Sequence, residues 1–256
     1  MTLRLSGGRR LQSPPGSVAR PTTARVRLAV LNLLTAELPG SRWLDLCSGS
    51  GVMACEALQR GARQVVAIEH DRRVAAVARA NLQAVAGGAL PGAIKPQLEV
   101  VEDDVLRWLG QGRSGRAEAF ELIYADPPWA AGLYEGIAAA VAAGQWLSPG
   151  GTMVWECPSK ATPVPPRGWL LRDQRRYGSS TLMLLQLQDP VQRSAAEGAA
   201  AAVLVPGGDE QADQGDGDQT EHDAAEQGFD HGVGAVIPMP HSSMMGRTTV
   251  SSRHHP

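Results

Sequence analysis

The stretch Arg42-Trp43-Leu44-Asp45-Leu46-Cys47-Ser48-Gly49-Ser50-Gly51 decides the fold class of this 256-residue chain. Its first five residues are largely apolar and predict a buried strand. Gly49 and Gly51 allow a tight turn and a close approach of a ligand to the backbone. The residues after Gly51 predict a helix, so strand, glycine-rich turn and helix follow one another directly. This order is typical of a sheet that binds its ligand at the end of a strand.

The same alternation of strands and helices continues along the chain. Helices are expected from Thr22 or Thr23 to Pro39-Gly40, from the turn to Arg60, over Arg72–Val85 and over Gly132–Ala143. The expected strands are Arg42–Leu46, Gln64–Glu69, Gln97–Val101, Phe120–Ala125, Thr152–Glu156 after the Ser148-Pro149-Gly150-Gly151 turn, Leu170–Arg175 and Ser180–Leu187. Only four residues separate the last two strands, which predicts a C-terminal antiparallel hairpin. We therefore expect an α/β fold with a mostly parallel seven-stranded sheet covered on both faces.

Composition divides the chain into a basic body and an acidic tail. Residues 190–256 hold 10 Asp or Glu and 3 Arg, a formal −7, whereas the preceding residues carry a formal +5. We expect residues 1–20 to be an irregular basic segment and 21–188 to form the domain. Residues 189–256 are polar and poor in aromatic residues, which favours a disordered tail. The histidines of this tail are too widely spaced for a metal site, and none is expected.

Arginine is concentrated near the N-terminus. The first 42 residues contain seven arginines and a single acidic residue, Glu37. The planar guanidinium binds two phosphate oxygens at once, so this pattern indicates a nucleic-acid contact, although a GC-rich genome also enriches arginine.

Cys47, Cys55 and Cys157 form no CxxC pair and indicate reduced thiols. Without a signal-peptide core or a membrane-length apolar stretch, we expect a soluble cytoplasmic protein. We also expect it to be a monomer.

The glycine-rich loop is not a phosphate loop. Ala54 stands where a dinucleotide fingerprint has its third glycine, and no Gly-Lys-Ser/Thr follows. Asp45 at the head of the loop disfavours phosphate and suits a cation. Glu69 ends the second strand 24 residues later, near the offset at which an acid binds ribose hydroxyls. Asp103-Asp104 ends the third strand and is suited to an adenine amino group.

A ligand with a ribose, an adenine and an ammonium but no phosphate fits S-adenosylmethionine. An alternative interpretation makes Asp45 and Asp104 helix N-caps and Glu69 a solvated strand end. Three acids at successive strand ends favour the cofactor interpretation.

Asp126-Pro127-Pro128-Trp129 follows the fourth strand directly. Neither proline has a backbone N–H, and both Asp126 and Pro127 are biased toward extended backbone because they precede proline. The Asp126 carboxylate and the local carbonyls are therefore acceptors without local donors, beside a flat indole on which a base could stack. The motif predicts a site for an exocyclic amine, whereas the simpler alternative is a turn with an exposed Trp.

These motifs together resemble the RsmD family of bacterial 16S ribosomal RNA guanine-N2 methyltransferases, over roughly residues 4–187. The segments that carry the resemblance are Arg20-Pro21-Thr22-Thr23-Ala24-Arg25-Val26-Arg27, Asn32, Asp45–Gly51, Glu56-Ala57-Leu58, Arg60-Gly61-Ala62, Glu69-His70-Asp71, Asp126-Pro127-Pro128 and Tyr177-Gly178. The Arg20–Arg27 segment is the most particular to the family. Ser48 where the family usually has alanine, Ala54 where glycine is common, and Trp129 where Phe or Tyr is usual depart from its pattern.

The resemblance implies a Rossmann-like class I S-adenosylmethionine-dependent methyltransferase that acts on 16S rRNA, free or in an assembling 30S subunit. It implies catalytic roles for Asp126, Pro127, Pro128 and Trp129. The implied cofactor-binding residues are Asp45, Cys47, Ser48, Gly49, Ser50, Gly51, Glu69, His70, Asp103, Asp104 and Val105. The implied RNA-binding residues are Arg9, Arg10, Arg20, Thr22, Thr23, Arg25 and Arg27.

Two alternatives stay open. An adenine-N6 DNA methyltransferase shares the Asp-Pro-Pro-aromatic chemistry, but it predicts a target-recognition insertion of many tens of residues that the sequence lacks. A non-catalytic ribosome-assembly factor that binds RNA need not retain Asp45, Glu69 and Asp126, all of which are present.

Overall fold

The computed structural model describes residues 3–14, 22–88, 95–113 and 118–188. The predicted tail at 189–256 and Arg20 lie outside these ranges, so the expectations placed on them stay predictions.

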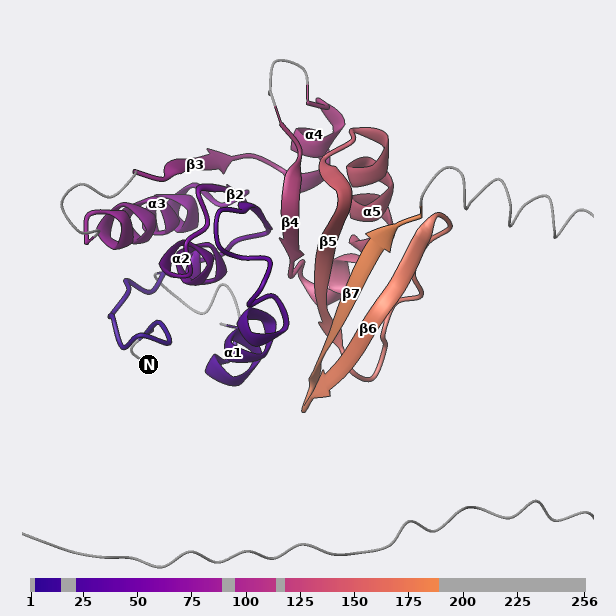
Figure 1. Cartoon of the computed structure of the whole chain (residues 1–256), viewed down its shortest axis with the longest axis horizontal. Helices are drawn as coiled ribbons and strands as arrows, with labels where there is room; N and C mark the ends of the chain where they lie inside the picture. The colour runs from indigo at the N-terminus through magenta and orange to yellow at the C-terminus, as the bar shows by residue number, and fades with distance from the viewer. Residues whose placement is uncertain (1–2, 15–21, 89–94, 114–117, 189–256) are drawn as a thin grey trace, which may run out of the picture. The chain divides into compact units, whose positions relative to one another are not determined.

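One seven-stranded sheet organises the described residues (Figure 1). Its strands lie in the order β3-β2-β1-β4-β5-β7-β6. β1 to β5 are mutually parallel, and β7 pairs antiparallel with both β5 and β6. The predicted mostly parallel sheet with a C-terminal hairpin is confirmed. The strands are β1 (Arg42–Leu46), β2 (Gln64–Glu69), β3 (Gln97–Glu102), β4 (Phe120–Ala125), β5 (Leu147–Pro158), β6 (Trp169–Tyr177) and β7 (Ser180–Leu187).

Helices cover both faces of the sheet because alternate strand residues are apolar on both sides. α1 (Ala24–Leu33), α2 (Val52–Gln59) and α3 (Arg72–Ala86) contribute to the core on the face that carries Trp43 and Tyr124. α4 (Val105–Gly110) and α5 (Tyr134–Ala143) pack on the opposite face, with Leu44 and Ile123. Figure 1 shows these two helical layers on either side of the strands.

Three local features differ from the sequence prediction. α1 ends at Leu33 rather than at Pro39-Gly40. Leu34 and Leu38 are buried although they lie beyond the helix, so the apolar spacing continues past its end. β5 begins at Leu147 and absorbs the expected glycine turn as an irregularity in its pairing with β4. The short helix α4 was not predicted, because six residues hold too few turns to show a period.

The N-terminal residues pack on the domain. Leu5 and Leu11 are buried in the core beside α1 and α2, and backbone pairing between Arg4 and Arg10 forms a small loop. Glu56 on α2 is fully buried and accepts hydrogen bonds from the Ser6 backbone N–H (2.7 Å) and hydroxyl (2.6 Å). This short segment is therefore fastened to the body.

The strand order reverses direction beside β1. β2 and β3 lie on one side of β1, and β4 and β5 lie on the other. Sheets of this kind usually bind their ligand at such a reversal. The site is the crevice at the carboxyl ends of the two strands that flank it. Leu46 pairs with Ala125, so the loop after β1 and the segment after β4 lie next to each other at this edge.

Candidate functional site

The loop after β1 turns through three residues with left-handed backbone. Cys47 has φ 61°, Gly49 54° and Gly51 71°. A Cβ at Gly51 would lie 3.1 Å from the Ala78 Cβ, so α3 approaches the loop too closely for any other residue without displacement. Within the described residues, the buried Ser48 hydroxyl has no hydrogen-bond partner. The loop therefore combines a hydroxyl without a hydrogen-bond partner, on Ser48, with a close approach of its backbone to α3 at Gly51.

Asp45 lies under this loop and is only 1% exposed. Its Oδ2 accepts a hydrogen bond from the Ala54 N–H at 2.9 Å, in the first turn of α2. Burial raises the pKa of Asp45 to about 8, and the charge of Glu69 acts in the same direction. The hydrogen bond from Ala54 lowers this pKa but does not offset the effect of burial. A cation bound beside Asp45 would favour the ionised form, so the position suits a positively charged ligand.

Glu69 at the end of β2 is buried rather than solvated, with 6% exposure. Its Oε2 accepts from the Gly49 N–H at 2.8 Å, and Oε1 accepts from the Asp71 N–H at 3.0 Å. His70 is exposed and places its Nδ1 3.1 Å from Glu69 Oε1. A carboxylate has about four acceptor positions, so Glu69 retains capacity to accept from a ligand hydroxyl.

Asp103 and Asp104 occupy the end of β3 in different ways. Asp104 is the N-cap of α4 and accepts from the N–H groups of Leu106 (3.0 Å) and Arg107 (2.9 Å). Asp103 accepts from the Asp104 N–H at 2.7 Å and pairs with the Arg107 guanidinium. Val105 begins α4 and is buried. The capping interpretation therefore describes Asp104, whose role toward an adenine stays a prediction.

The Asp126–Trp129 segment leaves the sheet beside this loop. Asp126 is half-buried, Pro127 is buried and Pro128 is exposed. The Thr22 hydroxyl donates to Asp126 Oδ2 at 3.4 Å, which brings the residues before α1 against the carboxylate. Trp129 begins a 3-10 turn (η1, Trp129–Ala131) and is 36% exposed, a large amount for so apolar a side chain. The segment combines an acceptor with an accessible aromatic surface.

The electrostatics of Cys47 show that these acids converge. Burial raises the pKa of its thiol to about 12, and the charges of Glu69, Asp45, Asp126 and Asp104 raise it further. Acids at or just after the carboxyl-terminal ends of four different strands therefore lie close enough to one side chain to act on its thiol. The acidic loop and the unpartnered Ser48 hydroxyl fit the S-adenosylmethionine expected from the sequence, because that molecule carries cationic groups and hydroxyls and no phosphate.

A second layer lies beneath Asp126 and was missed from the sequence. Glu156 on β5 is 4% exposed and accepts from the Tyr124 hydroxyl at 2.6 Å and the Ser180 hydroxyl at 2.8 Å. Tyr134 donates to the Glu156 backbone oxygen at 2.7 Å. Burial, together with the charges of Glu156 and Asp126, raises the pKa of Tyr124. Glu156 also ends an apolar strand segment, the same signal that identified Glu69.

Asn81 on α3 connects the N-terminal segment to the loop. It is 2% exposed, accepts from the Gln12 N–H at 2.8 Å, and donates to the carbonyls of Gln12 and Ser50, both at 3.0 Å. An asparagine inside an amphipathic helix gives no sequence signal of such a contact.

The arginines predicted to bind RNA have different surroundings. Arg25 is exposed, and its guanidinium has no ion-pair partner among the described residues. Arg10 is exposed, as is Thr23, whose hydroxyl caps α1. Arg27 is 6% exposed and donates to the carbonyls of Thr22 (2.7 Å) and Arg4 (2.6 Å), which leaves little of it for an RNA backbone.

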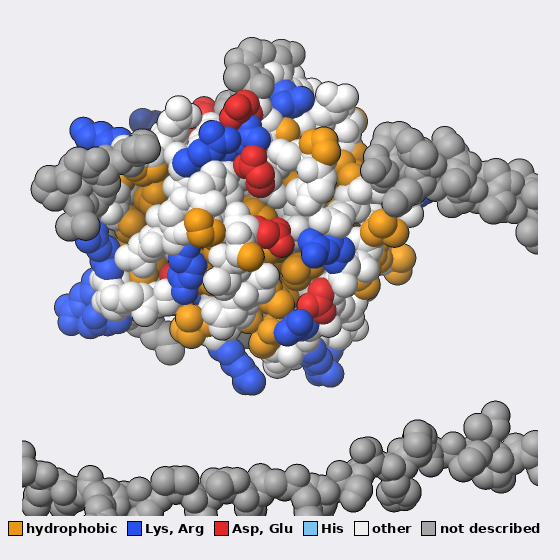
Figure 2. Space-filling model, in the orientation of Figure 1, with side chains coloured by type: hydrophobic (Ala, Val, Ile, Leu, Met, Phe, Trp, Pro, Cys, Tyr) orange, Lys and Arg blue, Asp and Glu red, His pale blue; other side chains and the backbone are white. Residues whose placement is uncertain are grey.

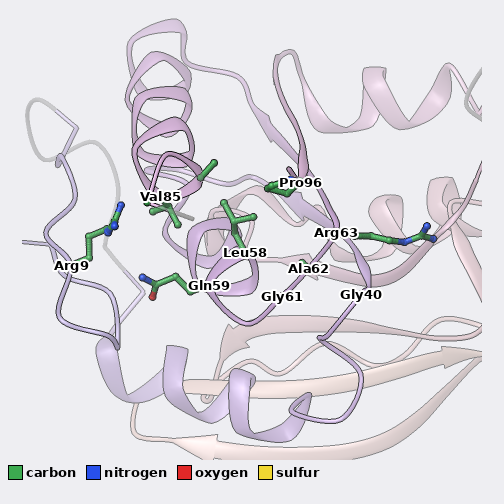
Figure 3. Close-up of a pocket in the computed structure, with 11 residues that line it drawn as sticks. Arg9, Gly40, Leu58, Gln59, Gly61, Ala62, Arg63, Val85 and Pro96 are labelled. Atoms are coloured by element: carbon green, nitrogen blue, oxygen red, sulfur yellow. The ribbon is translucent and has the colours of Figure 1, made fainter. Parts of the chain in front are cut away.

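Arg9 lies at the amino ends of the parallel strands. It lines a hollow of about 520 Å³ with Gly40, Arg63 and Pro96, which come just before or at the start of β1, β2 and β3 (Figure 3). Its guanidinium donates to the Ala84 carbonyl at 2.5 Å. Because parallel strands run from this edge to the Asp126 edge, Arg9 and Asp126 lie at opposite ends of the strands.

Comparisons with known proteins add to this geometry. The family model described as Conserved hypothetical protein 95 matches residues 5–186. The Ribosomal RNA small subunit methyltransferase D of Haemophilus influenzae is 28% identical over 179 residues, which cover 70% of this chain and 89% of that protein. The protein of the same description from Escherichia coli K12 is 28% identical over 70% of this chain and 85% of its own length.

A solved structure agrees with the fold. A hypothetical protein from Thermus thermophilus is 25% identical, with a TM-score of 0.59, and the match covers 72% of this chain and 99% of that one. In the part of this chain that the structure describes, no helix has the length and apolar composition to cross a membrane.

Proposed function

Since the chain belongs to the Conserved hypothetical protein 95 family, whose related members include rRNA methyltransferases, we propose that it methylates the exocyclic N2 amine of one guanine in 16S rRNA. The cofactor of this methyltransferase family is S-adenosylmethionine. The observation that carries the proposal is the half-buried Asp126 beside an acidic glycine-rich loop and an exposed Trp129.

The loop and its acids would hold the cofactor. Asp45 would face positive charge, Glu69 would accept from ribose hydroxyls, and the left-handed turn at Gly49 and Gly51 would admit close contact with the backbone. When bound, S-adenosylmethionine supplies an electrophilic methyl group on a sulfonium.

Asp126 and the Pro127 carbonyl would orient the amine. The N2 lone pair of guanine is delocalised into the ring, so the amine is a weak nucleophile. Acceptors for both N–H bonds would favour localisation of the lone pair toward the methyl donor, and Asp126 would receive the proton that leaves. Trp129 would hold the base flat by stacking. Positioning of the two reactants in this way accounts for a large part of the rate acceleration of such transfers.

The target guanine must leave its stack to reach Asp126. Enzymes that modify a base take a flipped or single-stranded nucleotide. Arg25, exposed three residues after Thr22, and the exposed Arg10 would contact RNA phosphates. The printed names of the relatives support rRNA as the substrate.

Nucleoside mass spectrometry of rRNA and of DNA from cells that lack the gene tests the proposal. We expect the loss of one N2-methylguanosine from 16S rRNA and its return when the wild-type gene is supplied. Unchanged N2-methylguanosine would refute the proposed reaction, and a loss of N6-methyladenosine from DNA would favour the alternative chemistry.

A further inference from the structure

A groove of about 530 Å³ lies between α1 and the β6–β7 hairpin. Arg25, Leu28 and Asn32 line it from α1, and Arg175 and Tyr177 line it from β6. These two groups of residues are about 150 positions apart in sequence, so only the fold brings them together. The volume is within the range of about 300–1,000 Å³ typical of sites that bind small groups.

The groove opens toward the carboxyl ends of the parallel strands, where Asp126 lies. Thr22 contacts Asp126, and Arg25 follows in the first turn of α1. At the other wall, Pro158 at the end of β5 pairs with Ser180 just after the hairpin turn, so the tip that carries Tyr177 lies at the carboxyl end of β5. From Arg25 to Asn32 the groove follows α1 for about 10 Å. It therefore leads away from Asp126 along the helix.

The groove has cationic side chains suited to phosphates and an aromatic ring suited to stacking on a base that is not paired. Arg25 is exposed and lacks an ion-pair partner among the described residues, and α1 contains no acidic residue. Arg175 is exposed, and its Nε donates to Asp173 Oδ2 at 2.8 Å, in an ion pair whose two side chains are 55% and 33% exposed. Tyr177 is half-buried against the α1 side of the core, which fixes its ring. Figure 2 shows Lys and Arg side chains along the lower margin of the molecule, where Figure 1 places α1 and the hairpin tip.

We infer that this groove binds the single-stranded RNA next to the nucleotide that enters the Asp126 site. Arg25 and Arg175 contact phosphates from the two walls, the Tyr177 ring stacks on a flanking base, and the Asn32 amide hydrogen-bonds a base edge or a 2′-hydroxyl. The exposed Leu28 lies under the sugar. This inference rests on the proposed function for the identity of the RNA, and it adds the hairpin as a second wall of the substrate site.

The test compares two variants with matched controls by filter binding to in vitro transcribed 16S rRNA, across about 50–200 mM salt. R25A/R175A removes both cations, and R176A is its control, because Arg176 is exposed on the opposite face of the same strand. Y177L removes the stacking ring but keeps an apolar side chain, and Y177F is its control. Calorimetric S-adenosylmethionine affinity and thermal midpoints are measured for every variant.

We expect R25A/R175A to bind at least about tenfold more weakly and to reduce the salt slope by about 1.4, with cofactor affinity and thermal midpoint unchanged. Y177L should lose about fivefold or more, and Y177F and R176A should match wild type. Equal affinity and slope for R25A/R175A and R176A overturn the inference, as does wild-type affinity of Y177L. If the wild type binds RNA through these residues but makes no N2-methylguanosine, the inference stands and the proposed reaction fails.

Discussion

At the scale of single residues, the raised pKa of Asp45 makes the free energy of unfolding depend on pH. Its native pKa of about 8 exceeds its ordinary value of 3.8, so between these values the folded protein holds a proton that the unfolded chain lacks. The contribution of Asp45 to the free energy of unfolding is thus full below pH 3.8 and is lost as pH rises toward 8, by about 1.4 kcal/mol per pH unit.

D45N should lose this pH dependence, because its amide stays neutral and still accepts from the Ala54 N–H. Urea unfolding from pH 5 to 8 in the absence of cofactor measures the effect. We expect the wild type to be destabilised relative to D45N as pH rises, and cofactor affinity of D45N to fall at least about tenfold. Parallel stability profiles would contradict the assigned protonation.

Gly51 tests how closely α3 and the loop approach. G51A should cost about 2–4 kcal/mol of unfolding free energy, because it combines a left-handed φ of 71° with a Cβ 3.1 Å from the Ala78 Cβ. G49A is the matched control, since φ is 54° there and no atom lies within 4 Å of the added Cβ. We expect about 1–2 kcal/mol for G49A, and equal losses for both variants would show that the close approach costs nothing.

At the scale of elements, the N-terminal segment depends on Glu56. This fully buried carboxylate contacts Arg27 at 3.5 Å and Arg60 at 3.1 Å in addition to Ser6. E56A leaves the buried Arg27 uncompensated and should cost about 3–5 kcal/mol. Chemical denaturation measures the loss, and hydrogen exchange of residues 3–12 should show it locally.

E118A provides the comparison, because Glu118 pairs with Arg42 and Arg63 at the surface and is 54% exposed. Its loss should stay below about 1 kcal/mol. Similar losses for the two variants would mean that Glu56 does not hold the segment.

Elements with a clear period and clear ends were predictable from sequence. β1, β2 and β4 have the predicted bounds because apolar runs stand between turn residues. The end of α1 was not predictable, since Leu34 and Leu38 are buried from outside the helix and continue its apolar spacing. α4 was not predictable from its period because it has only six residues, and its one sequence signal, the Asp104 cap, was equally consistent with a ligand-binding acid.

At the scale of the whole molecule, sequence predicted which strand ends carry acids, and topology decided which of them meet. The charges of Asp45, Glu69 and Asp126 all act on Cys47 because neighbouring parallel strands have their carboxyl ends on the same side of the sheet. Arg9 and Arg25 both belong to the arginine-rich N-terminal region. The fold nevertheless places them at opposite ends of the parallel strands. The groove between α1 and β6 depends on contacts across about 150 residues, and no local pattern indicates them.

At this scale the proposed role of Asp126, to orient a guanine amine for methylation, can be measured directly. Small ribosomal subunits from cells lacking the gene, incubated with methyl-tritiated S-adenosylmethionine, test it in wild type, D126A and E135A. Glu135 is an exposed carboxylate on α5 and serves as the control. We predict N2-methylguanosine formation at least about a hundredfold slower in D126A, with unchanged cofactor affinity and a wild-type rate in E135A. Near-wild-type turnover of D126A would contradict the account.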